Sequence, residues 1–269
     1  MNTVRSVYHY FLAWLSAVYY RRPSRKLFVI GITGTKGKTT TVALMKSIFE
    51  TNGSRAAALS SINSPAQNTM PGRGAIQKFL KNAVNSGCEY AVIEVTSQGV
   101  TQHRHRFIDW DAAVFLNISP EHIESHGSFA KYREAKLKFF RSLGTSKKKK
   151  RYFFINTEDQ NAIYFQKAAE RVPRGVIVPF SASDGREIIE KVREKSSADW
   201  LKADFNTSNV SAALAIARTL GIKERTICKA LEEFKGVPGR MEFVQKKPFS
   251  AVVDYAHTPN SLEAVYKNL

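Results

Sequence analysis

The sequence predicts an α/β protein built on a mostly parallel, doubly wound sheet. Short apolar runs rich in β-branched residues alternate along the chain with longer runs that have helical periodicity. Polar residues gather directly after several of these apolar runs, at the sheet edge where parallel α/β folds bind ligands. A glycine-rich loop, GITGTKGKTTT at residues 31–41, separates the first apolar run from a helical pattern.

The expected elements follow one another from residue 27 to the end of the chain. Strands are expected over the short apolar runs at 27–32, 55–60, 90–95, 112–117, 151–156 and 175–180. Helices are expected over the amphipathic patterns at 39–49, 76–84, 129–143, 162–171, 208–220 and 225–234. A further strand and helix begin after residue 249, and the sequence ends within that helical pattern.

Three parts are expected on this basis. Residues 1–25 would form an N-terminal aromatic and basic helix, and residues 26–245 the central domain. Residues 246–269 would form the beginning of a C-terminal Rossmann-like domain, because a strand followed by a helix is its first unit.

The composition is strongly basic. Lysine and arginine outnumber acidic residues by 41 to 23, a formal net charge of +18. Such an excess attracts nucleic acid, anionic lipid or phosphorylated small molecules. No helicase-type motif accompanies it, so nucleic acid is not an expected partner, and the basic block at 147–151 is interpreted as a solvated loop. Cys88 and Cys228 are far apart and indicate neither a disulfide framework nor a metal site.

The apolar segment at residues 8–20 allows two interpretations. It is too short to span a bilayer, and it lacks the small-residue cleavage site of a signal peptide. A helix packed on the protein is preferred. The alternative is an interfacial helix that makes a weak peripheral contact with anionic lipid.

The loop after the first strand has the context of a phosphate-binding loop, although Ile32 stands where the general motif has glycine. Gly34 and Gly37 allow the backbone N–H groups to face phosphates. Lys38 can reach the β and γ oxygens, and the Thr39 hydroxyl can bind Mg²⁺. The expected nucleotide-binding residues in the loop are Gly34, Thr35, Lys36, Gly37, Lys38, Thr39 and Thr40.

The short loop TGTKGKTTT resembles that of the Mur ligases, the ATP-dependent amide ligases of peptidoglycan synthesis. Four further stretches resemble motifs of that family in the same order: EVTSQGV, NISPEHIESHGSFAKYREAK, GVPGRMEFV and VDYAHTPNSLEAV. The last is most like the ligases that act on UDP-MurNAc-L-Ala-D-Glu. The resemblance runs from about residue 27 to the end of the sequence.

The resemblance implies a cytoplasmic enzyme that uses ATP and two Mg²⁺ ions. It would activate a substrate carboxylate as an acyl phosphate and then join it to an amine. The implied substrates are UDP-MurNAc-L-Ala-D-Glu and a diamino acid, L-lysine or meso-diaminopimelate. Two alternatives stay open: another Mur-type ligase, similar to folylpolyglutamate or cyanophycin synthetases, and an ATP-binding module without turnover.

The resemblance also implies roles for individual residues. Glu94 would be a Mg²⁺ ligand, which suits a carboxylate at the end of a buried strand, and Lys136 would be carbamylated by CO₂. The implied catalytic residues are Lys38, His122, Lys136 and Arg240. The implied metal ligands are Thr39, Glu94, His122 and Lys136. Asn209, Arg240 and Asp254 would contact the nucleotide, and Asn68, Thr69, Thr96, Ser97, His126 and His257 the substrates.

Two differences from the family pattern bear on the substrates. Met70 replaces the second threonine of a segment that grips the sugar nucleotide. The family's N-terminal domain and most of its C-terminal domain have no counterpart in the sequence. We therefore expect either a fragment or a protein that uses a partner chain for those domains.

Overall fold

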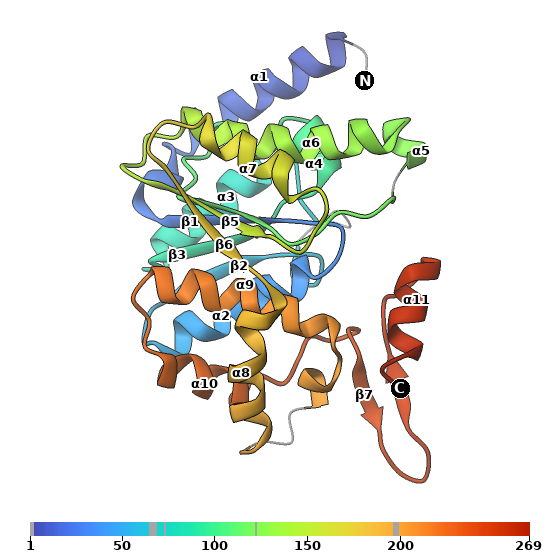
Figure 1. The fold of residues 1–269 in the computed structure, drawn as a ribbon. Coiled ribbons are helices and arrows are strands. Elements are labelled where there is room, and N and C mark those ends of the chain that lie inside the picture. The colour runs from blue at the N-terminus through green and yellow to red at the C-terminus, as the bar shows by residue number, and fades with distance from the viewer. Residues whose placement is uncertain (1–2, 65–68, 73, 122, 196–198) are drawn as a thin grey trace.

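The computed structural model describes residues 3–64, 69–72, 74–121, 123–195 and 199–269 (Figure 1). A six-stranded sheet forms its centre, with the strand order β2-β3-β1-β4-β5-β6 and every neighbouring pair parallel. The strands are β1 (Phe28–Thr33), β2 (Ala56–Leu59), β3 (Tyr90–Glu94), β4 (Ala112–Phe115), β5 (Arg151–Asn156) and β6 (Gly175–Phe180). The expected α/β fold with a mostly parallel sheet is confirmed.

The central strand β1 is buried on both faces of the sheet. Successive side chains of a strand point to opposite faces, so Ile30 and Ile32 belong to one core cluster and Val29 to the other. A Cβ atom at Gly31 would lie 2.3 Å from the ring of Phe139. Glycine at this position therefore allows the helix that carries Phe139 to pack closely against the sheet.

Helices cover both faces of the sheet, as the doubly wound prediction requires (Figure 1). On the face of Ile30 lie α2 (Lys38–Thr51), α8 (Ala182–Arg193), α9 (Phe205–Thr219) and α10 (Glu224–Glu233). On the opposite face lie α3 (Ala75–Asn85), α6 (Phe129–Ser142) and α7 (Ala162–Glu170). Short helices α4 (Ser97–Thr101) and α5 (Ile123–His126) follow β3 and β4, and single 3₁₀ turns span Pro23–Lys26, Leu143–Thr145 and Asp199–Lys202.

The helix α8 was not among the expected elements. The carboxylate of Asp184 accepts a hydrogen bond of 2.6 Å from the backbone N–H of Ser181 and caps its first turn. Gly185 lies within this helix, and a Cβ there would lie 2.6 Å from Ser211 Oγ on α9. The glycine thus permits close helix packing and does not interrupt the helix.

The N-terminal segment forms helix α1 (Thr3–Tyr19), which lies along the outside of the molecule (Figure 1). One of its faces contacts the protein, through a 2.8 Å hydrogen bond between Ser6 and His103 and through ring contacts of Tyr10 with His103 and Phe107. The preferred packed interpretation therefore describes one face only. None of the helices in the described ranges is long and apolar enough to cross a membrane.

The C-terminal segment contains an antiparallel pair, β7 (Glu242–Gln245) and β8 (Ala251–Val253), followed by α11 (Pro259–Tyr266). The expected strand and helix after residue 249 are both present, and β7 is an additional strand. A small separate cluster that includes Met241 and Val265 holds this unit together. The expected domain boundaries after residues 25 and 245 stay predictions.

Candidate active site

The loop from residue 34 to residue 37 joins β1 to α2 at the carboxyl edge of the sheet. Its backbone is held by Asn117, which follows β4. Thr35 N–H donates to the backbone oxygen of Asn117 at 3.0 Å, and Lys36 N–H donates to Asn117 Oδ1 at 2.9 Å. The Asn117 side chain completes the pairing by donating to the Lys36 carbonyl at 3.2 Å. The loop is therefore fixed by the neighbouring strand.

Gly37 occupies a position that only glycine fits without strain. Its φ is +83°, and a Cβ there would lie 2.1 Å from Asn209 Oδ1. Asn209, on α9, also accepts a 3.3 Å hydrogen bond from Thr41 Oγ1 and donates one of 3.0 Å to Asn206 Oδ1. The sequence predicted Asn209 beside the nucleotide, and the structure brings it against the loop.

The helix α2 begins at Lys38, directly after Gly37. The first amides of a helix have no partners within the helix, and they carry the positive end of its dipole. Lys38 Nζ donates to the Thr35 carbonyl at 2.8 Å and lies 3.6 Å from Glu94 Oε1. The N-terminus of α2 and this ammonium group together form a site suited to phosphate.

Three oxygen-bearing side chains meet beside Lys38. Thr39 Oγ1 donates to Glu94 Oε2 at 2.8 Å and lies 2.9 Å from Ser61 Oγ. Glu94, the last residue of β3, is 4% exposed. A buried carboxylate is costly without a cation, so this site has the charge and the ligand atoms of a cation site.

These oxygens fit Mg²⁺. Mg²⁺ binds oxygen octahedrally at about 2.0–2.1 Å, which puts adjacent ligand oxygens about 2.9 Å apart. The Thr39–Glu94 oxygen separation of 2.8 Å matches this requirement. Within the described ranges no group of three His, Cys, Asp or Glu side chains could hold a metal ion. The side chains that could hold an ion here are those of Thr39 and Glu94.

Lys136, on α6, is buried directly behind the loop. It is 1% exposed, and its Nζ donates to the Gly34 carbonyl at 2.7 Å. Burial, and then the nearby charge of Lys38, lower the pKa of this amine well below its usual value. The neutral amine is the form that can attack CO₂ as a nucleophile, so the environment of Lys136 fits the implied carbamylation.

Tyr132 lies one helical turn before Lys136 and closes the back of the loop. Its hydroxyl lies 3.1 Å from Thr35 Oγ1, which in turn accepts from Ser119 N–H at 3.0 Å. Burial raises the pKa of Tyr132 to about 12, so the phenol stays protonated. Sequence reasoning assigned no role to Tyr132, Ser61 or Asn117. The position of Asn117 at the end of the fourth expected strand, and the spacing of four residues between Tyr132 and Lys136, are the signals that point to two of them.

A second group of predicted residues lies beyond β3. Thr96 caps α4 by accepting from Gly99 N–H at 3.1 Å, and Ser97 Oγ lies 3.1 Å from His126 Nε2. The His126 ring packs against Tyr132 at 5.3 Å between centroids, which joins this group to the loop. The predicted residues Asn68 and His122 lie outside the described residues.

Met70 has a packing role in the structure. It is buried, and its Sδ would lie 2.3 Å from a Cβ at Gly99, so it fills the space beneath α4. Its carbonyl accepts a hydrogen bond from Arg104, a residue that sequence reasoning missed. Thr69, the preceding residue, is half-buried.

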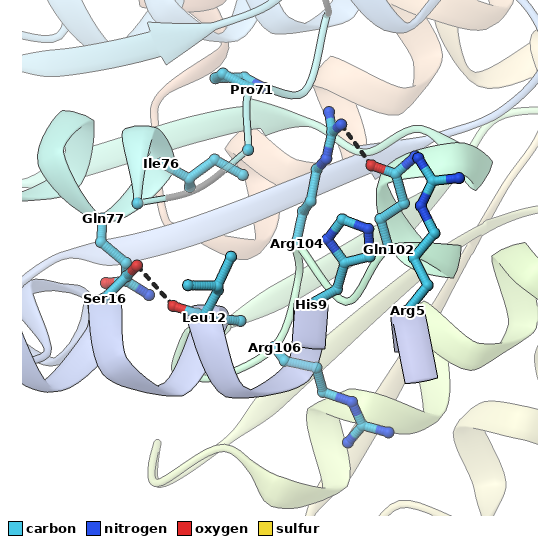
Figure 2. Close-up of a pocket in the computed structure, with 13 residues that line it drawn as sticks. Arg5, His9, Leu12, Ser16, Pro71, Ile76, Gln77, Gln102, Arg104 and Arg106 are labelled. Carbon is cyan, nitrogen blue, oxygen red and sulfur yellow. Dashed lines mark hydrogen bonds between the residues drawn. The ribbon is translucent and has the colours of Figure 1, made fainter. Parts of the chain in front are cut away.

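A basic cavity of about 430 Å³ adjoins Met70 and opens beside α1 (Figure 2). Figure 2 shows the side chains of Arg104 and Gln102 with their tips together, and a hydrogen bond of 2.5 Å joins them. Three arginine side chains line the cavity: Arg5 from α1, and Arg104 and Arg106 from the segment after α4. None of its described lining residues is acidic. Such a lining favours an anionic group.

The remaining predicted residues lie in the C-terminal unit. The Arg240 guanidinium stacks on Tyr255 at 4.5 Å, and the Asp254 carboxylate accepts from Met241 N–H and Ala256 N–H, both at 2.7 Å. In the part of the chain that the structure describes, no hydrogen bond or ion pair joins Arg240, Asp254 or the exposed His257 to residues 34–40. Their nucleotide and substrate roles stay predictions.

Thr258 provides a link between the C-terminal unit and the central sheet. Its hydroxyl donates to Glu121 Oε1 at 3.4 Å, in the segment that follows β4. The unit therefore lies on the side of the sheet that carries the loop. The part of the site whose residues contact one another directly consists of residues 34–40, Glu94, Lys136 and Asn209.

Comparison with known proteins agrees with this arrangement. Residues 32–217 match the Mur ligase middle domain family. UDP-N-acetylmuramoyl-L-alanyl-D-glutamate–2,6-diaminopimelate ligase of Bacillus velezensis is 34% identical over 94% of this chain and 56% of its own length. UDP-N-acetylmuramyl-tripeptide synthetase of Roseiflexus sp. is 31% identical over 95% of this chain and 57% of its own length.

A solved structure of a UDP-N-acetylmuramoyl-L-alanyl-D-glutamate–2,6-diaminopimelate ligase is similar at a TM-score of 0.71 and 26% identity, covering 90% of this chain and 53% of that one. This chain thus spans a little over half the length of the relatives it matches. The family match covers well over half of the chain and includes the loop, Glu94, Lys136 and Asn209. The chain belongs to the Mur ligase family.

Proposed function

We propose that the protein is an ATP-dependent ligase that joins a substrate carboxylate to an amino group. The observation that carries this proposal is the convergence of a phosphate-type loop, the Thr39–Glu94 oxygen pair and the buried amine of Lys136. A plain ATP-binding site would not require a buried lysine behind the loop. The positive N-terminus of α2, the Lys38 ammonium group and the modifiable amine of Lys136 all lie at the same loop. This combination suits a reaction in which phosphate is transferred.

In this reaction the phosphates of ATP would lie on the first turn of α2. Lys38 would contact the transferring γ-phosphate, and Thr39 and Glu94 would hold a Mg²⁺ ion that neutralises phosphate charge. A substrate carboxylate oxygen attacks the γ-phosphorus, and ADP leaves, giving an acyl phosphate. The incoming amine then attacks the carbonyl carbon, and inorganic phosphate leaves as the amide forms. Positioning by the loop contributes most of the remaining rate enhancement.

Lys136 would act as a carbamate. Its neutral amine adds to the carbon of CO₂ and releases one proton to solvent, which replaces a neutral group near Lys38 with an anion. The anion would attract Lys38 and help to hold a second Mg²⁺ ion together with His122. The lowered pKa of Lys136 supports this role, because the ammonium form cannot attack CO₂.

For the substrates we propose UDP-MurNAc-L-Ala-D-Glu and a diamino acid, L-lysine or meso-diaminopimelate. The names of the relatives support the first, and the Bacillus velezensis relative supports diaminopimelate. Thr96, Ser97 and His126, which lie together next to the loop, would contact the muropeptide. The reaction would take place in the cytoplasm. Parts that the longer relatives carry beyond the matched region would come from a partner chain or from further sequence.

The proposal is tested by incubating the protein with ATP, Mg²⁺, UDP-MurNAc-L-Ala-D-Glu and each diamino acid in turn, and measuring phosphate release and product mass. We expect release that requires both the muropeptide and one diamino acid. Release with a folate or another carboxylate in place of the muropeptide would favour a different Mur-type ligase. ATP binding without release under any condition would favour a binding module and would refute the ligase assignment.

A further inference from the structure

The outer face of α1 is an apolar stripe. Eight bulky apolar side chains recur at the spacing of three and four residues that places them on one side of a helix. Each is between 40% and 77% exposed: Val4, Val7, Tyr8, Phe11, Trp14, Leu15, Val18 and Tyr19. We call this set the apolar stripe.

The inner face of α1 is more polar than the stripe. Ser6 bonds to His103, and His9 and Ser16 line the basic cavity (Figure 2). Only Ala17 of this helix is fully buried. An ordinary surface helix packs its apolar face on the core and gives its polar face to water. The reverse arrangement here indicates a surface that is covered by something else.

A basic cluster adjoins the end of α1. Residues 3–26 contain five lysine or arginine residues and no acidic residue. The fold brings the block at 147–150 to the same place, because this block and Arg25 both contact the carboxylate of Asp109. Arg25 Nε lies 3.1 Å from Asp109 Oδ2, and Lys147 N–H donates to Asp109 Oδ1 at 2.8 Å. Segments about 120 residues apart thus meet at a side chain that is itself 6% exposed.

Among the described residues, most of the charge in this cluster has no acidic partner. Asp109 offsets Arg25, and Asp111 lies 2.9 Å from Lys148 Nζ. The exposed members of the basic cluster are Arg21, Arg25, Lys26, Lys147, Lys149 and Lys150. The block that the sequence suggested to be a solvated loop therefore belongs to a positive surface next to the stripe.

We propose that the apolar stripe and the basic cluster form one docking surface for an anionic phospholipid bilayer. Phenylalanine, tyrosine and tryptophan side chains insert at the level of the headgroups, and lysine and arginine are attracted by the anionic leaflet. A second copy of the chain is a poorer occupant, since it would bring a further charge of +18 to the same surface. The proposal is independent of ligase activity.

The electrostatic part is tested by sedimentation with vesicles of phosphatidylcholine alone or mixed with phosphatidylglycerol. We expect binding to the anionic vesicles and little to the neutral ones. Each basic residue near an anionic surface contributes about a fivefold gain in partition, so K149A/K150A should weaken binding roughly 25-fold. The matched control K229A/K235A removes two exposed lysines on the far side of the sheet and should leave binding nearly unchanged.

The apolar part is tested with F11A/L15A, which keeps every charge. Transfer of the two side chains into the interface predicts a loss of at least tenfold. The control V244A/F249A trims two exposed apolar side chains elsewhere. Unchanged thermal unfolding would show that the variants are folded.

Equal binding to neutral and anionic vesicles, or full binding by F11A/L15A, would overturn the proposal. The proposal would also be overturned if light scattering showed a dimer that does not bind vesicles, and if the F11A/L15A variant were a monomer. ATP binding by all four variants should match that of the unchanged chain, which separates this test from that of the proposed function.

Discussion

Replacing Gly37 by alanine should disrupt the contact between the loop and α9 and so lower the free energy of unfolding. The φ of +83° costs an alanine about 1–2 kcal/mol. The new Cβ would also lie 2.1 Å from Asn209 Oδ1. The amide of Asn209 cannot swing away freely, because Asn206 and Thr41 hold it by hydrogen bonds. Overpacking of this kind costs a further ~1–3 kcal/mol, so G37A should lose about 2–5 kcal/mol of unfolding free energy.

A double-mutant cycle separates the two contributions. N209A alone should cost about 1–3 kcal/mol, because Asn206 and Thr41 each lose one of their hydrogen-bond partners. In G37A/N209A the three atoms closest to the new Cβ are gone, so only the backbone cost of G37A should remain. The coupling free energy should then be at least ~1 kcal/mol. The assay is urea unfolding of the four proteins followed by circular dichroism. Strict additivity, or a G37A protein as stable as the original, would refute the packing argument.

Four other outcomes are expected. E94Q should lower Mg²⁺-dependent turnover of ATP roughly a hundredfold, about 2.7 kcal/mol, because Lys38 and the metal ion lose a buried charge; steady-state kinetics would check it. Y132F should cost about 1 kcal/mol of stability in urea unfolding, since Thr35 loses one of its partners. In CO₂-free buffer K136M should be more stable than the original at pH 7 in thermal unfolding. With ¹³C-bicarbonate the original chain should show a carbamate resonance in NMR that K136M lacks.

The sign of the K136M prediction follows from the pKa of Lys136. The folded pKa lies below the unfolded value of 10.5, so between the two the unfolded chain binds more protons. Stability therefore rises with pH through this window, and it is reduced below it. Methionine removes the titration, so the pH profile of K136M should be flatter. Parallel profiles of the two proteins would show that Lys136 is not held neutral, and E94Q with normal Mg²⁺ dependence would remove Glu94 from the metal site.

The inner strands β1, β3, β4 and β5 were predictable because they are almost entirely buried and their sequences are continuous apolar runs. The loop was predictable for a different reason, because its glycine, lysine and threonine residues are contiguous in the sequence. The helix α8 was not predicted; its Gly185 is unfavourable in a helix by local propensity, whereas its role is contact with Ser211 on another helix. Such a contact has no signature within a short window of sequence.

Long-range contacts also explain what sequence reasoning missed in the site. Asn117 and Ser61 act through residues more than twenty positions away, and Arg104 is defined by its contact with Met70. Lys136 was identified through family resemblance, and its burial behind Gly34 now supplies a physical reason. The motif of Arg240 and Asp254 was recognised, but a local pattern does not determine how its unit sits relative to the loop.

The central claim is that this site activates a carboxylate by phosphoryl transfer. It is tested most directly with UDP-MurNAc-L-Ala-D-Glu whose glutamate carboxylates carry ¹⁸O at every oxygen, incubated with ATP, Mg²⁺ and the accepted diamino acid. Attack of the carboxylate on the γ-phosphate predicts that one ¹⁸O atom appears in each inorganic phosphate, measured by mass spectrometry. Phosphate that is released without label, or no release at all, would contradict the account.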